Sequence, residues 1–83
     1  MELIEFRITN NAYSEPQVLT SNCNAITFYN AGSTTMVIDN VNYAPGAQFP
    51  IPGNFGEIIN QTFNLAFTGI GTNNCIVYRK IYS

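Results

Sequence analysis

The chain is 83 residues long, only 10% of its residues are charged, and its formal net charge is −2. This length fits one domain, and 3 basic side chains are too few for the positive surface that nucleic-acid binding requires. The sequence also has no apolar run of the roughly 18 residues that a membrane-spanning helix needs, and it does not open like a secretory signal, so we expect synthesis in a reducing cytoplasm.

Uncharged polar residues take the place of charge in this sequence. Ordinary soluble domains have about 25% charged residues, whereas this chain has 12 Asn and 8 Thr and is 46% hydrophobic. Because the buried centres of protein interfaces are depleted in charge, the composition predicts that a partner covers much of the surface. Codon bias in an AT-rich genome would lower the charge without any interface and is the alternative explanation.

Residues that bind metals or perform acid–base catalysis are scarce. The sequence has no His, its carboxylates are scattered, and Cys23 and Cys75 are far apart, so we predict no metal site and no cofactor. In a reducing cytoplasm we expect the two cysteines to be free, buried thiols, and a disulfide between them is the alternative.

The first half of the chain predicts short strands separated by polar loops. Residues 3–9 alternate, with Ile4, Phe6 and Ile8 on one face, which predicts a half-buried strand. A polar loop is predicted over residues 10–16. After a short extended piece at residues 17–20, a second clear strand is predicted at residues 25–29, with Ile26 and Phe28 on one face and Thr27 and Tyr29 on the other.

A tight hairpin is predicted around Asp39-Asn40. Both residues tolerate the left-handed backbone conformation that a two-residue type I′ turn requires. This turn fixes the register of the two strands that it joins and places their apolar residues on one face. The expected cross-strand pairs on that face are Ile38 with Val41 and Met36 with Tyr43.

The second half of the chain predicts three more strands. Residues 48–52 are extended but contain two prolines, which places them at a sheet edge. A turn at residues 53–56 leads to the segment 57–59, and residues 62–68 then alternate without a fault, with Phe63, Leu65 and Phe67 on one face. After a Gly-rich loop, the last strand at residues 75–82 is apolar on both faces, so it can lie between a core and a partner.

Short strands with frequent turn signals predict an all-β fold. We expect residues 1–83 to form a single domain, an antiparallel β-sandwich of jelly-roll or Ig-like type or a small barrel, with about 6–8 short strands.

No arrangement of residues points to catalysis. Without His, an enzyme would depend on carboxylates, and Asp39 and Glu57 are the candidates for a glycosidase pair. Structural roles explain both residues better, Asp39 as a turn former and Glu57 as a loop side chain, so we expect no enzymatic activity and assign no catalytic residue.

The tyrosines are the best candidates for a binding surface. Tyr43 is expected in the core, whereas Tyr29, Tyr78 and Tyr82 are expected on the surface, where they could anchor a protein interface or stack on sugar rings. Ordinary strand tyrosines with solvated hydroxyls are the alternative.

A resemblance to a known class of protein extends over roughly residues 26–82, and four segments carry it. They are Ile26-Thr27-Phe28-Tyr29-Asn30, Met36-Val37-Ile38-Asp39-Asn40-Val41, Ala44-Pro45-Gly46-Ala47-Gln48-Phe49 and Gly53-Asn54-Phe55-Gly56-Glu57-Ile58. In style they resemble the small β-sandwich virion structural proteins of tailed bacteriophages. The resemblance implies a capsid decoration or auxiliary protein, or a head- or tail-associated subunit.

Two functions are therefore expected from the sequence. The first is a bacteriophage virion component, made in the host cytoplasm, which binds other virion proteins and itself, as a trimer or higher ring, and binds neither nucleic acid nor membrane. The second is a carbohydrate- or receptor-binding β-sandwich module, which the tyrosines and the many Asn side chains would serve.

Overall fold

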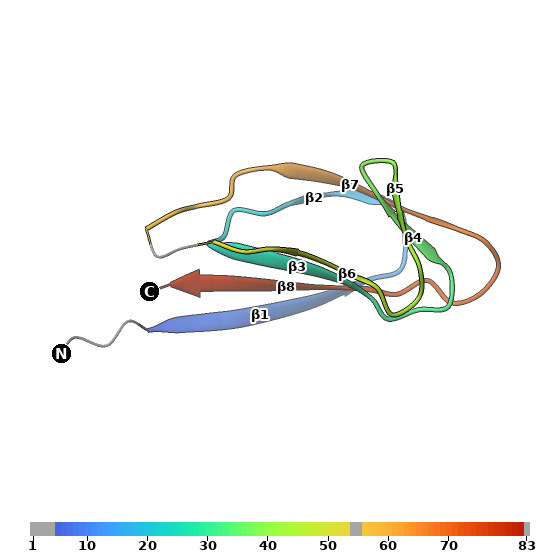
Figure 1. The fold of residues 1–83 in the computed structure, drawn as a ribbon, viewed down its shortest axis with the longest axis horizontal. Helices are drawn as coiled ribbons and strands as arrows, with labels where there is room; N and C mark the ends of the chain where they lie inside the picture. The colour runs from blue at the N-terminus through green and yellow to red at the C-terminus, as the bar shows by residue number, and fades with distance from the viewer. Residues whose placement is uncertain (1–4, 54–55, 83) are drawn as a thin grey trace.

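The computed structural model describes residues 5–53 and 56–82, and it confirms the predicted all-β sandwich. Two antiparallel sheets of four strands each pack face to face (Figure 1). The eight strands are β1 Phe6–Tyr13, β2 Gln17–Thr20, β3 Ala25–Asn30, β4 Thr35–Ile38, β5 Val41–Tyr43, β6 Gln48–Ile51, β7 Thr62–Thr68 and β8 Cys75–Tyr82.

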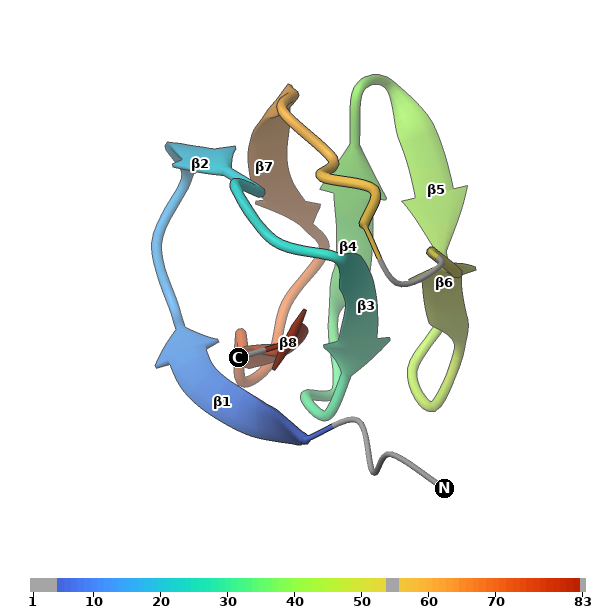
Figure 2. The same ribbon diagram turned by 90° about the vertical axis from the view of Figure 1, so that its left-hand side faces the viewer.

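The strand order is that of a jelly roll, one of the predicted alternatives. Sheet A has the order β1-β8-β3-β6 and sheet B has the order β2-β7-β4-β5. The pairs β1–β8, β2–β7, β3–β6 and β4–β5 are nested, so the chain resembles one long hairpin rolled into two layers. The molecule is elongated, 51 × 19 × 15 Å, and Figure 2 views it along its long axis.

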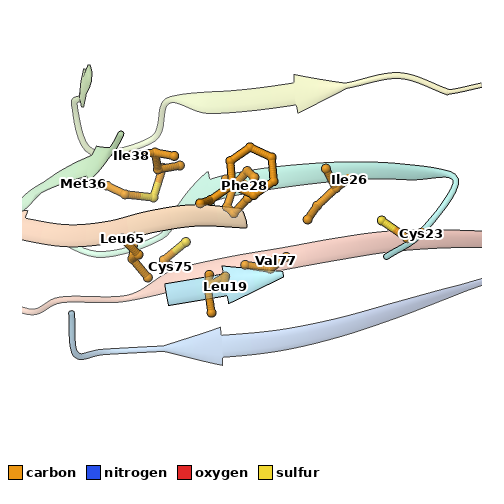
Figure 3. Close-up of a cluster of buried hydrophobic side chains, with 10 residues drawn as sticks. Leu19, Cys23, Ile26, Phe28, Met36, Ile38, Leu65, Cys75 and Val77 are labelled. Atoms are coloured by element: carbon orange, nitrogen blue, oxygen red, sulfur yellow. The ribbon is translucent and has the colours of Figure 1, made fainter. Parts of the chain in front are cut away.

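The core lies between the two sheets and is built from the alternating residues of their inner faces (Figure 3). Phe28 from β3 packs edge-to-face on Phe63 from β7, with ring centroids 4.9 Å apart, and so joins the sheets. Phe49 stacks on Phe28 at 5.8 Å and on Tyr43 at 5.4 Å, which confirms the core position of that tyrosine. The buried apolar residues are Leu19, Cys23, Ile26, Phe28, Met36, Ile38, Phe63, Leu65, Cys75 and Val77.

The Asp39-Asn40 hairpin forms with the predicted register. The φ angles of Asp39 and Asn40 are 50° and 68°, as a type I′ turn requires. Ile38 pairs with Val41 and Met36 pairs with Tyr43. Val41 is nevertheless 52% exposed, because β5 is the edge strand of sheet B and has no neighbour beyond it among the described residues.

Buried Asn side chains act as internal connectors. Asn30, which is 1% exposed, donates from Nδ2 to the carbonyls of Thr34 (2.8 Å) and Tyr43 (3.0 Å). Its Oδ1 accepts from the amide of Gly32 at 3.2 Å. Asn30 therefore satisfies three backbone groups, two in the connection between β3 and β4 and one in β5, and part of the high Asn content serves the interior instead of the surface.

The expected burial of the first strand is wrong. Phe6 and Ile8 are 52% and 57% exposed, and Ile4 lies outside the described residues. The cause is the register with β8, in which Phe6 lies opposite Tyr82 and Ile8 lies opposite Lys80. These residues share the side of sheet A that faces away from the core.

The predicted polar loop at residues 10–16 is also wrong over most of its length. β1 continues through Asn10, Asn11 and Ala12 to Tyr13, and all of these residues pair with β8. Tertiary pairing overrides the low strand propensity of Asn. In the predicted turn at 53–56, residues 54–55 lie outside the described residues.

The hairpin turn gives a direct test of the local backbone. We expect Asn40→Ala to lower the free energy of unfolding by about 1 kcal/mol, because a Cβ-bearing residue without a polar side chain disfavours positive φ. Asn40→Gly should be neutral within experimental error, since Gly accepts that conformation. Urea denaturation of both variants measures this difference, and equal stability of the two would contradict the turn assignment.

Candidate functional site

The outer face of sheet A is the most distinctive surface of the molecule. Cys75 and Val77 point from β8 into the core, so the alternate residues of β8 point outward, and the registers with β1 and β3 extend this face across the sheet. We use the term outer face for the residues of sheet A that point away from the core. They are Phe6, Ile8, Asn10, Ala12, Ala25, Thr27, Tyr29, Gln48, Pro50, Ile76, Tyr78, Lys80 and Tyr82.

The structure brings the three candidate tyrosines onto this single face. Tyr29 on β3 lies opposite Ile76 on β8, Tyr78 lies opposite Thr27 on one side, and Tyr82 lies opposite Phe6 on the other. Tyr78 is 37% exposed, and Tyr29 and Tyr82 are partly buried by their neighbours. The three residues therefore belong to one surface.

Two members of the outer face were missed by the sequence prediction. Phe6 and Ile8 were assigned to the core, yet each is more than half exposed beside Tyr82 and Lys80. The signal that could have found them is β8, because a central strand that is apolar on both faces implies apolar neighbours on both sides of its sheet.

Lys80 is the one charged residue of the outer face as defined, and it is held between aromatic rings. Its Nζ lies 4.4 Å from the ring centroid of Phe6 and 5.0 Å from that of Tyr82. The two rings are 5.9 Å apart in an edge-on arrangement. Such cation–π contacts keep the ammonium close to the apolar surface, so the positive charge sits within the face where a partner's carboxylate could meet it.

Arg79, the sequence neighbour of Lys80, has a structural role on the opposite side of sheet A. Its Nη2 donates to the carbonyl of Thr20 at 2.9 Å, and its Nη1 donates to Oδ1 of Asn11 at 3.4 Å. Arg79 thus bridges the two sheets at the side where β1 faces β2. Because side chains alternate along β8, Arg79 points inward and links the two sheets, whereas Lys80 points to the outer face.

The two carboxylates considered for catalysis have different partners. Asp39 Oδ1 accepts from the backbone amide of Asn64 at 2.9 Å and from its Nδ2 at 3.2 Å, which ties the hairpin turn to β7 and confirms the turn-forming role. The backbone carbonyl of Glu57 accepts from Nδ2 of Asn24, in the connection before β3. Among residues 5–53 and 56–82, no three His, Cys, Asp or Glu side chains are grouped as a metal site would require.

A cavity of about 360 Å³ lies where β8 ends near the connection before β3. Its buried polar lining residue, Asn24, is already committed, because its Nδ2 binds the Glu57 carbonyl and its Oδ1 accepts from the amide of Tyr82 at 2.9 Å. This cavity therefore offers little to orient a ligand. It is lined by Asn22, Cys23, Asn24, Gly56, Ile58, Ile81 and Tyr82.

Neither sequence nor structure comparison relates the chain to a known protein. Protein-family models, curated proteins and solved structures gave no match. In the part of the chain that the structure describes, no helix is long and apolar enough to cross a membrane. The class that the geometry defines is a jelly-roll β-sandwich with an apolar, tyrosine-rich outer face.

Both cysteines are buried free thiols. Burial raises the pKa of the Cys75 thiol from its ordinary value of 9.0 to about 11. Burial also raises the pKa of Cys23, although the Arg79 guanidinium and a hydrogen bond from the Ala25 backbone oppose the effect. The thiols are therefore poor nucleophiles in the folded protein.

The Cys75 thiol predicts a loss of stability in alkali. Because the pKa of the thiol is higher in the folded than in the unfolded chain, the contribution of the neutral thiol to the free energy of unfolding is intact below pH 9. This contribution falls as the pH rises from 9 to about 11. We expect the loss to be about 2 kcal/mol in the free energy of unfolding. Urea denaturation between pH 8 and pH 11 should show a shallower fall for Cys75→Ala than for the natural chain, and parallel curves would contradict this assignment.

Proposed function

We propose that the chain is a structural subunit of a bacteriophage particle, a capsid decoration or auxiliary protein or a head- or tail-associated subunit, which acts through protein–protein contacts. The observation that carries this proposal is the outer face of sheet A. It presents Phe6, Ile8, Tyr29, Tyr78 and Tyr82 on one side of a chain that has only 10% charged residues.

Covering this face would be energetically favourable. Burial of apolar surface contributes about 25 cal/mol per Å², and aromatic side chains near the centre of an interface supply much of its binding energy. Tyr78, the exposed aromatic residue in the middle of β8, is the natural anchor. Lys80 would pair with a carboxylate of the partner at the side of this anchor.

Composition and resemblance support the same proposal. A chain with few charges gains little solubility from its surface, and permanent coverage by a neighbouring protein removes that disadvantage. The jelly roll itself is shared by viral capsid domains and lectin domains, so the fold alone does not decide between assembly and binding. The likeness of residues 26–82 to phage virion proteins favours assembly, with self-association as part of it.

This proposal predicts that particles contain the chain and that Tyr78 helps to hold it there. Mass spectrometry of purified phage particles from the source should detect the natural chain. Particles made with Tyr78→Lys should contain at least tenfold fewer copies, because a charge would be buried at the anchor position.

The matched control is Val18→Lys, which introduces the same charge at an exposed apolar residue of sheet B. It should leave the copy number unchanged. Particles without any copies of the natural chain would refute the virion assignment, and equal loss with both variants would refute the role of the outer face.

A carbohydrate-binding module is the second candidate, and the placement of Tyr29, Tyr78 and Tyr82 on one face favours it. Aromatic rings on a flat sheet can stack on sugars, and the neighbouring Asn10, Thr27 and Gln48 side chains offer hydrogen bonds. Under this alternative, the chain binds at least one sugar on a broad glycan array, and Tyr78→Ala weakens that binding about tenfold while Val41→Ala does not. The absence of binding across the array would reject it.

A further inference from the structure

We infer that β1 is an open sheet edge that pairs with β1 of a second copy of this chain. This inference concerns the edge of sheet A and does not rest on the proposed function, which concerns the outer face. It starts from a difference between β1 and the other three edge strands.

The other edges carry features that discourage further strand pairing. β2 has 4 residues and directly follows Pro16, and β5 has only 3 residues. β6 contains Pro50, which cannot donate a ladder hydrogen bond. Short strands and prolines are the means by which natural sheets protect their edges from association.

β1 has none of these features. It is 8 residues long, contains no Pro, and pairs with β8 over all 8 positions without a bulge. None of its residues has a positive φ, and among the described residues only β8 lies beside it in the sheet. A long, regular strand with one unpaired side is a template for another strand.

The sequence of β1 is complementary to itself. In an antiparallel pair, residues directly opposite each other lie on the same face. A two-fold axis midway between Thr9 and its image satisfies this condition from Phe6 to Ala12. Thr9 then faces its own image, a favourable pair, and Arg7 faces Asn11. On the outer face, Phe6 meets Ala12 and Ile8 meets Asn10 of the second copy.

Charge also favours a second copy as the occupant. Arg7 is the one charged residue in β1, and the symmetric pairing places it opposite the neutral side chain of Asn11. The Oδ1 of Asn11 accepts from Arg79 at 3.4 Å and has a second lone pair that can accept from Arg7. No like charges are opposed across this pair of strands. The pairing would join two copies of sheet A into one sheet of eight strands, with their outer faces continuous.

Solution mass and targeted variants test this inference. Light scattering on the natural chain, over about a hundredfold range of concentration, should show a mass that rises to that of a dimer. Thr9→Lys should remain monomeric, because two like charges would face each other at the axis, and Arg79, which lies opposite Thr9 in β8, would not neutralise them. Thr62→Lys, an exposed change on sheet B, should dimerise as the natural chain does. A natural chain that stays monomeric, or a Thr9→Lys variant that still dimerises, would overturn the inference.

Cysteine cross-linking tests the register even if Thr9→Lys does not fold. With the axis at Thr9, a Thr9→Cys pair lies directly opposite its image, at a Cβ separation of about 5 Å, and mild oxidation should give a covalent dimer. Asn10→Cys is the control, because its images lie diagonally at about 7–8 Å, beyond a disulfide. The native Cys23 and Cys75 are buried and should not react. Cross-linking of Asn10→Cys alone, or of neither variant, would overturn the Thr9-centred pairing.

Discussion

The alternation of β8 is the constraint on which the rest of the structure depends. β8 lies inside sheet A between β1 and β3, so its side chains must point either to the core or to the outside. Cys75 and Val77 complete the core between the sheets. Because Cys75 and Val77 point inward, the alternate residues Ile76, Tyr78 and Tyr82 have to point outward. These residues are apolar or aromatic, and so the outer face is apolar as well.

Local features of the fold could be predicted from the sequence, whereas features that depend on a distant partner could not. The hairpin at Asp39-Asn40 was predicted with its register because the turn and its pairs are neighbours in the chain. The orientation of β1 was not, because alternation separates two faces without telling which one meets the core. Only pairing with β8, at the other end of the described chain, decides that Phe6 and Ile8 point outward.

The candidate site could also be predicted only in its local features. Tyr29, Tyr78 and Tyr82 could be chosen one at a time as surface residues, but their placement on one face depends on the register between β3 and β8. Composition was also ambiguous. A high Asn content suggests a polar surface, yet Asn24 and Asn30 are buried and bind backbone groups of other segments of the chain. No local sequence pattern predicts this role.

The nested pairing of the jelly roll also bears on how the protein is made. β1 leaves the ribosome before its partner β8, and sheet A cannot be completed until β8 has been synthesised. Contacts between distant segments slow folding because long loops must close before any pairing is gained. Until β8 has been made, a nascent chain carries Phe6, Ile8 and an unpaired strand, a state prone to aggregation in which chaperone protection would be of value.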